Sequence, residues 1–283
     1  MTQTPPGGTP AVPLFKSLGT RLGMTPWWLV AILALGVVGL VAAATNGDYS
    51  VIFGAIASGI PVTLGVAMVA FVAAIVLGLV LGLLKSSQVR IARELATFYI
   101  ELVRGLPMLV VLYYIAFVGA PALAGVLNWL LSPLIALHWM EPLLARDFDF
   151  ATRAILALTL GYAAFIAEIF RAGIESVDKG QIEAALALGL SRGQVTRRIV
   201  LPQAIRNVLP ALGNEFVAVI KDSSLVSALG VQDITQLGKV YSASTFRFFE
   251  TYNVVAFFYL CLTVSLSMLV RRLERRLKEG QSR

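Results

Sequence analysis

The stretch that decides the fold class is GIPVTLGVAMVAFVAAIVLGLVLGLL (Gly59–Leu84), which contains no charged residue. A helix needs about 20 mainly apolar residues to cross the hydrocarbon core of a bilayer, which is about 30 Å thick. The stretch meets this requirement, and other long uncharged runs precede and follow it. Of the 283 residues 58% are hydrophobic and 14% are charged, whereas a soluble domain carries roughly 25% charged residues. The sequence therefore predicts an all-α membrane protein.

Six segments are long and apolar enough to be candidate spans: Trp27–Thr45, Gly59–Leu84, Phe98–Val118, Phe150–Phe170, Ala204–Ile220 and Tyr252–Val270. Lys and Arg are concentrated in alternate connecting segments, and cytoplasmic segments carry the excess of these residues. The alternation predicts that both chain ends are cytoplasmic, which requires an even number of spans. A seventh apolar stretch, Leu123–Leu137, would break the alternation. We interpret it as a helix across the outer membrane surface, anchored by Trp129 and Trp139, with a re-entrant segment as the alternative.

The same pattern divides the chain into four regions. Residues 1–26, which are rich in Pro, Thr and Gly, are predicted to be a disordered cytoplasmic tail. Residues 27–58 would hold the first span and an outer loop, residues 59–270 the main transmembrane domain, and residues 271–283 a basic cytoplasmic tail. The first span is interpreted as retained rather than as a cleaved signal, because its uncharged run exceeds a typical signal core.

The composition argues against several functional classes. The single cysteine, Cys261, lies in an apolar span, and the single histidine, His138, lies in a non-basic loop, so no metal site is expected. The spans hold no His cluster, paired-carboxylate site or Ser/His arrangement, which argues against a membrane-embedded enzyme and leaves no catalytic residue to name. The chain also lacks a G-x-x-x-x-G-K-[ST] motif, so it is not expected to bind ATP itself.

The segment DKGQIEAALALGLSRGQVTRRIVLP (Asp178–Pro202) lies in a strongly basic loop and contains two helix-start signals. Asp178 and Gln181 have the spacing of a capping box, and Ser191 and Gln194 repeat that spacing. The loop is therefore predicted to contain two short, capped helices that are held by membrane spans at both ends. Such a rigid protrusion is suited to docking with a cytoplasmic partner.

Two further signals describe how these helices are joined. Gly189 is well placed to end the first helix in a left-handed conformation, and Leu201-Pro202 predicts a break before the next span. A DNA-binding helix-turn-helix is a rival interpretation, because A-x-x-x-G-x-S followed by a basic helix fits it. Tethering between two spans leaves little room for a duplex, so no nucleic-acid partner is expected.

The loop resembles the EAA loop of bacterial ABC-importer permeases, spacing included, and the matching residues are Glu183, Ala184, Ala185, Gly189, Ile199, Leu201 and Pro202. YIELVRGLP (Tyr99–Pro107), AEIFRAGIESV (Ala167–Val177) and PALGNEFVAVIKDSSLVS (Pro210–Ser227) resemble, in order, segments of the polar amino-acid permease branch of the histidine/glutamate/glutamine type. The similarity covers roughly Gly59 to the C-terminus.

This resemblance implies a type I ABC-importer permease of the bacterial inner membrane that imports polar amino acids, with glutamate, glutamine or aspartate-like substrates favoured. Its coupling helix, about Lys179–Gly193, would sit in a cleft of a separate ATPase dimer, which would bind the ATP and Mg; this chain would bind no cofactor. The resemblance also implies a second permease subunit, identical or paralogous, and an external or periplasmic amino-acid-binding protein. An ion-gradient-driven secondary transporter or channel is the alternative, although it does not explain the twice-capped loop.

Ionisable groups within spans are costly and by default suggest a pathway. Glu101 with Arg104, and Glu168 with Arg171, have i,i+3 spacing, so each pair can neutralise itself on one helix face. We predict that both pairs are structural and lie near the cytoplasmic interface.

A second polar set interrupts or ends the weakest span, where Pro210 and Gly213 predict a broken helix of the kind that lines a cavity. A zwitterionic amino acid needs an acceptor for its ammonium group and donors for its carboxylate. Glu215 or Asp222 could provide the acceptor, and Lys221, Ser223 and Ser224 could provide the donors. The alternative, left equally open, is that Lys221-Asp222 marks the outer end of the span. The candidate pathway residues are Tyr162, Asn214, Glu215, Lys221, Asp222, Ser223 and Ser224.

Overall fold

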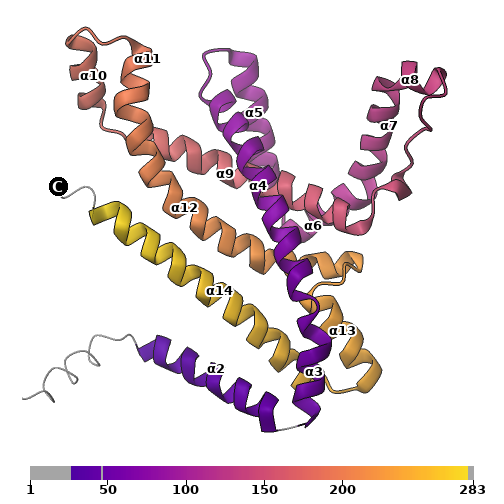
Figure 1. Cartoon of the computed structure of the whole chain (residues 1–283). Coiled ribbons are helices and arrows are strands. Elements are labelled where there is room, and N and C mark those ends of the chain that lie inside the picture. Colours follow the sequence, from indigo (N-terminus) through magenta and orange to yellow (C-terminus); the bar gives the residue numbers. More distant parts are fainter. Residues whose placement is uncertain (1–26, 46, 280–283) are drawn as a thin grey trace, which may run out of the picture. The chain divides into compact units, whose positions relative to one another are not determined.

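The computed structural model describes residues 27–45 and 47–279, and within these ranges every regular element is a helix (Figure 1). This confirms the predicted all-α class. The α-helices are α2 (Trp27–Thr45), α3 (Gly47–Ala57), α4 (Ile60–Lys85), α5 (Arg90–Arg104), α6 (Met108–Tyr114), α7 (Ala120–Leu130), α8 (Ser132–Ala136), α9 (Phe150–Glu175), α10 (Lys179–Ala187), α11 (Arg192–Val195), α12 (Leu201–Asp222), α13 (Ile234–Thr245) and α14 (Phe248–Glu279). Two π turns, η1 (Ile115–Gly119) and η3 (Thr196–Val200), and two 3₁₀ segments, η2 (Ala145–Asp147) and η4 (Ser223–Leu229), complete them.

The chain divides into two compact units, one ending at Ser50 and one beginning at Val51. The first unit contains α2, whose bounds are those of the first predicted span. The predicted disordered tail, residues 1–26, lies outside the described residues. The predicted outer loop of residues 46–58 is mostly helical, because Ile52 and Ile56 lie one turn apart in α3 and are both buried.

Four helices in the described ranges are long and apolar enough to cross a membrane: Gly47–Lys85, Met108–Leu130, Phe150–Glu175 and Phe248–Leu277. Three of these contain the predicted spans Gly59–Leu84, Phe150–Phe170 and Tyr252–Val270. The last helix continues to Glu279, so the described part of the predicted basic tail is helical. The count of six spans and the placement of the chain ends stay predictions.

The predicted span Phe98–Val118 is wrong. α5 ends at Arg104, and Pro107 holds an extended backbone (φ −60°, ψ 137°) before α6 begins. Proline lacks an N–H and disfavours helical backbone in the residue before it, so the helix cannot run through this point. The membrane-length helix starts at Met108 instead.

The predicted surface helix Leu123–Leu137 is also wrong in its bounds. Its first part, to Leu130, completes the helix that starts at Met108 and passes through η1, and only the short α8 follows. Trp129 and Trp139 are 75% and 78% exposed near this end of the helix. Their proposed contact with the membrane interface stays a prediction.

The most extensive helix contact of the second unit is between α4 and α9, and two glycines of α4 make it possible. A Cβ atom on Gly78 would lie 2.7 Å from Cγ2 of Ile166, and one on Gly82 would lie 3.0 Å from the carbonyl oxygen of Ala167. Small residues four positions apart let membrane helices approach closely. The GLVLG sequence of α4 therefore brings its backbone against α9.

The predicted break within the Ala204–Ile220 span is absent. α12 is continuous from Leu201 to Asp222 with Pro210 inside it, and irregular 3₁₀ structure begins only at Ser223. Gly213 serves packing instead, since a Cβ atom there would lie 2.8 Å from Cγ1 of Val270 in α14. Close contact with α14 supports the helix at the point where sequence alone predicts a break.

Candidate functional site

The loop between α9 and α12 forms the two capped helices that its sequence predicts. Asp178 caps α10, and its carboxylate accepts a hydrogen bond from the backbone N–H of Gln181 (3.0 Å). Ser191 and Gln194 form a complete capping box at α11, with each side chain accepting from the other residue's backbone N–H (2.8 and 3.4 Å). These bonds satisfy N–H groups that a helix start otherwise leaves without partners.

Gly189 ends α10 in the predicted left-handed conformation, with φ +84°. The N–H of Gly189 donates to the carbonyl of Leu186 (3.0 Å), and that of Leu190 donates to the carbonyl of Ala185 (3.2 Å). This pair of bonds is a Schellman motif, which satisfies the last carbonyls of a helix. The turn between α10 and α11 is therefore fixed by the backbone itself.

The predicted helix break at Leu201-Pro202 is wrong, because the helix continues through these residues. α11, η3 and α12 run on without a gap, and the π turn of η3 ends at the residue just before Leu201. A proline in an α-helix removes one hydrogen bond and clashes with the carbonyl four residues earlier. The wider π turn accommodates Pro202 without ending the helix.

Side chains hold the loop against α12. The Gln181 side chain, which does not complete the capping box at α10, instead accepts from Nε2 of Gln203 in α12 (2.8 Å). Nδ2 of Asn207 donates to Oγ of Ser176 at the end of α9 (2.8 Å). These two hydrogen bonds tie α10 and the end of α9 to α12.

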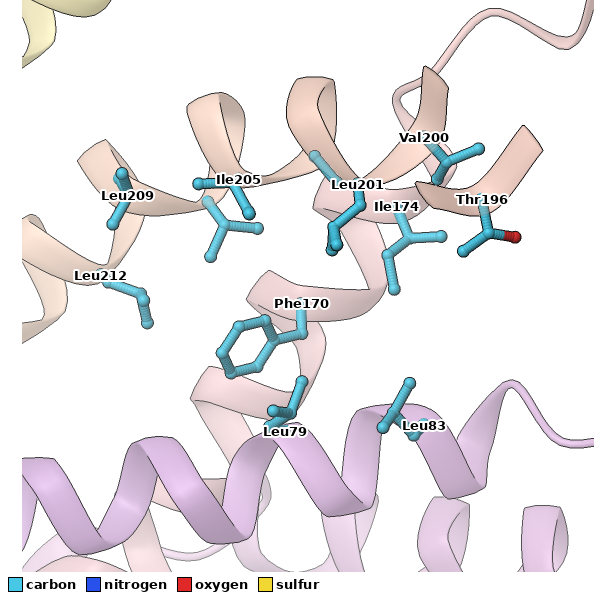
Figure 2. A pocket seen from close by; sticks show the side chains of 12 residues that line it. Leu79, Leu83, Phe170, Ile174, Thr196, Val200, Leu201, Ile205, Leu209 and Leu212 are labelled. Carbon is cyan, nitrogen blue, oxygen red and sulfur yellow. The ribbon is translucent and has the colours of Figure 1, made fainter. Parts of the chain in front are cut away.

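A pocket of about 500 Å³ lies between α10 and the start of α12. It is lined by four of the predicted coupling residues, Ala184, Ala185, Ile199 and Pro202, together with Gln181, Leu188, Leu190, Arg198, Gln203 and Arg206. Glu183 and Gly189 are exposed on the hairpin that α10 and α11 form. Leu201 does not line this pocket but lines a separate apolar groove (Figure 2). Leu188 is 82% exposed at the tip of the hairpin. Sequence reasoning missed Leu188, although an apolar residue next to a helix-ending glycine is visible in the sequence.

One of the two predicted charge pairs forms. Glu168 pairs with Arg171 as expected, and its other oxygen accepts from Nζ of Lys85 in α4 (3.0 Å). The prediction of a Glu101–Arg104 pair is wrong. The Glu101 carboxylate lies 3.7 Å from Nζ of Lys85, and the Arg104 guanidinium lies over the Phe165 ring at 5.8 Å from its centroid. Lys85 therefore joins α4, α5 and α9 near the end that leads into the loop.

The structure divides the predicted pathway residues between two faces of α12. Glu215 and Asp222 are seven residues apart, two helical turns on one face, and Oη of the buried Tyr162 in α9 donates to Oδ2 of Asp222 (2.8 Å). Asn214 and Lys221 are exposed.

The two serines that follow α12 occupy different environments. The buried Ser223 donates its hydroxyl to the Ile220 carbonyl (2.8 Å), while Ser224 is half-buried. The hydroxyl of Ser223 is therefore already used within the helix end.

Sequence reasoning missed a polar junction before α13. Asp233 is buried; its carboxylate accepts from the N–H of Gln236 (2.8 Å) and from Oη of Tyr259 in α14 (3.0 Å). The neighbouring Ile234 N–H donates to Oγ1 of Thr63 in α4 (3.2 Å). Burial raises the pKa of Asp233 above its usual value. The D-x-x-Q spacing matches that of Asp178 and Gln181, so the capping role at least was visible in the sequence.

Comparison with known protein families identifies the family to which this chain belongs. The model of the family described as "Binding-protein-dependent transport system inner membrane component" matches residues 74–279. The chain belongs to this family. The matched residues contain α9, the capped loop and α12, but not α2, so the first unit lies outside the part that defines the family.

Relatives of this inner membrane component are known in several bacteria. This chain is 40% identical over 223 residues to a probable amino-acid permease protein, YxeN, of Bacillus subtilis (strain 168), and the match covers 79% of this chain and 91% of the relative. It is 37% identical over 234 residues to the glutamine transport system permease protein GlnP of Escherichia coli (strain K12), covering 82% and 98%. A crystal structure of an amino acid ABC transporter with histidines matches with a TM-score of 0.67 and 35% identity, covering 81% of this chain and 95% of the other.

Proposed function

We propose that this inner membrane component is the permease subunit of an ATP-driven importer of polar amino acids. The observation that carries the proposal is the twice-capped α10–α11 hairpin, which projects exposed Glu183 and Leu188 from a protein of this family. Relatives named as glutamine, arginine and cystine transport permeases support polar amino acids as the substrate class.

In this proposal the hairpin docks in a cleft of a separate ATPase subunit. Glu183 supplies a charged contact, Leu188 an apolar anchor, and Ala184 a small surface that lets the partner approach. The Gly189 turn fixes the angle between the two helices. ATP and Mg belong to the ATPase dimer, whose closure would push on α10 and, through Gln181 and its partner Gln203, on α12.

The substrate pathway is proposed to follow the face of α12 that meets α9. The carboxylates of Glu215 and Asp222 are suited to accept an ammonium group, and Tyr162 orients the second of them. Asn214 and Lys221, on the neighbouring exposed face, are suited to bind a carboxylate. Ser223 is set aside, since its hydroxyl bonds within the helix; Ser224 stays a candidate.

The remaining partners follow from the same proposal. A second permease subunit, identical or paralogous, would complete the pathway, and an external binding protein would deliver the substrate. Both chain ends would lie in the cytoplasm, on the side of the ATPase, in agreement with the basic character of the α10–α11 loop.

The decisive test is uptake by proteoliposomes that contain the chain with its co-purifying ATPase and binding protein. Replacement of Glu183 by Arg (Glu183→Arg) places a positive charge at the docking surface. We expect it to lower ATP-dependent uptake at least tenfold, because reversing one buried interface charge costs several kcal/mol. The Glu141→Arg variant, an equal charge reversal at an exposed position outside the hairpin, should retain uptake.

Two results would contradict the proposal. Uptake that persists without ATP would favour a gradient-driven transporter. Wild-type uptake by Glu183→Arg would remove the hairpin from the coupling mechanism. Detergent-solubilised Glu183→Arg must elute as the wild type does in gel filtration, so that misfolding is not mistaken for uncoupling.

A further inference from the structure

The junction between α5 and α6 interrupts a helix at membrane depth. Arg104 ends α5, Pro107 is extended, and both are exposed. Met108, the first residue of α6, packs on α9, since a Cβ atom on Gly161 would lie 2.6 Å from its Cε. The 26-residue α9 is centred near Tyr162, so the junction lies beside the middle of a membrane-length helix. Irregular backbone at that depth is tolerated only where it is buried in protein or lines a water-filled cavity.

This junction carries a cation that has no ionic partner in the described part of the chain. Glu101, the partner that the sequence predicts for Arg104, lies against Lys85 instead. None of the ion pairs among residues 27–45 and 47–279 includes Arg104. A charge within the membrane is costly, and such residues mark substrate or ion pathways. The unpaired guanidinium at the break therefore indicates a position on the pathway rather than a structural ion pair.

Two aromatic side chains of α9 connect this cation to the proposed substrate pathway. The Arg104 guanidinium lies 5.8 Å from the centroid of the Phe165 ring, and that ring lies 6.1 Å from the Tyr162 ring. Tyr162 in turn donates a hydrogen bond to Asp222. Residues three apart share a helix face, so Arg104 and Asp222 meet the same wall of α9 at side chains about 4.5 Å apart along its axis.

The contact with Phe165 leaves the guanidinium ready to bind a planar anion. Stacking on a ring uses the flat face of the guanidinium, whereas its N–H donors point outward from the edge. Two parallel N–H donors of an arginine match the two oxygens of a carboxylate. Among the groups of an amino acid, the α-carboxylate is the anion that every member of the class carries. A donor for it beside an acceptor for the ammonium group is what a zwitterion requires.

We infer that Arg104 binds the α-carboxylate of the amino acid in the pathway, at the break between α5 and α6, while Asp222 accepts from its ammonium group. The inference rests on the proposed import of amino acids and gives Arg104 a role in binding in place of the structural role that the sequence predicts. Arg104 then reads a group that all amino acids share. Asn214 and Lys221 are left for the polar end of the substrate side chain.

The test measures binding to the complex of this chain with its co-purifying ATPase, in detergent and without the external binding protein. Equilibrium dialysis with radiolabelled glutamine, glutamate, aspartate, histidine and arginine selects the amino acid that binds most tightly. That amino acid is then compared with its own α-amide, which lacks the carboxylate. We expect the wild type to bind the free acid roughly tenfold more tightly, because a bidentate, charge-assisted pair is lost with the amide. Arg104→Gln should remove this preference.

Two further variants separate the proposed contact from a general effect of charge. Arg93→Gln removes an exposed arginine from the same helix, about three turns before Arg104, and should keep the preference for the free acid. Arg104→Lys keeps the charge but not the two parallel donors, so it should restore only part of the preference. All three variants must match the wild type in thermal midpoint without ligand and in assembly with the ATPase and the second permease subunit.

Several outcomes would overturn the inference. They are equal binding of acid and amide by the wild type, an undiminished preference in Arg104→Gln, and uptake by proteoliposomes without measurable binding to the complex. Loss of subunit assembly in Arg104→Gln would also contradict it, because the guanidinium would then pair with another subunit. Failure of the proposed function looks different, since proteoliposomes with the wild-type chain would then take up none of the five amino acids.

Discussion

At the scale of single residues, Gly189 sets the geometry of the hairpin. Its φ of +84° is left-handed, and no atom lies within 4 Å of where a Cβ would stand, so a substitution is opposed by backbone strain alone. That strain costs about 1–2 kcal/mol for a residue with a side chain.

We predict that Gly189→Ala frays the end of α10. Amide hydrogen exchange in residues 179–190 should become roughly tenfold faster, the equivalent of about 1.4 kcal/mol. Gly193→Ala is the matched control, because Gly193 has ordinary helical backbone and open space around it. Equal exchange in the two variants would mean that Gly189 does not hold the turn.

At the scale of helices, the contact between α4 and α9 depends on how near their backbones approach. Gly78 has no room for a Cβ, since Ile166 and the Ala163 carbonyl lie 2.7 and 3.0 Å from where it would stand. Gly65, on the same helix, has nothing within 4 Å. Substitutions at the two glycines can therefore be compared to separate the effect of packing from that of helix propensity.

We predict that Gly78→Val destabilises the protein by about 1–3 kcal/mol, the usual cost of overpacking. In detergent, this lowers the thermal midpoint by a few degrees. Gly65→Val should change it little. If both variants unfold at the same temperature, the close approach of α4 and α9 contributes nothing measurable to stability.

At the scale of the whole molecule, the arrangement of basic segments predicts which ends of the helices face the cytoplasm. Arg192 lies in the hairpin and Ser132 lies beyond the helix that ends at Leu130; both are exposed. In a Cys261→Ala background, a membrane-impermeant maleimide applied to intact cells should label Ser132→Cys and leave Arg192→Cys unlabelled. Permeabilised cells should show labelling of both. Labelling of Arg192→Cys in intact cells would reverse the predicted orientation and rule out a cytoplasmic ATPase at the hairpin.

The sequence by itself determined the features whose causes lie within a few residues. The apolar runs of α4 and α9, the caps at Asp178 and Ser191, and the left-handed Gly189 could all be predicted, because helix length, capping bonds and glycine backbone are local properties. The EAA resemblance needed only spacing along the chain.

Only the tertiary structure decided the features that depend on residues far apart in sequence. Lys85 pairs with Glu168 and with Glu101, so that Glu101 does not pair with Arg104, and Tyr162 donates a hydrogen bond to Asp222. These contacts form because α4, α5, α9 and α12 pack side by side. α12 stays helical at Pro210, where local propensity predicts a break, since contacts with neighbouring helices outweigh the cost of one lost hydrogen bond. The apolar groove between α4, α9 and α12 belongs to this second class, because its walls come from helices that only the fold brings together.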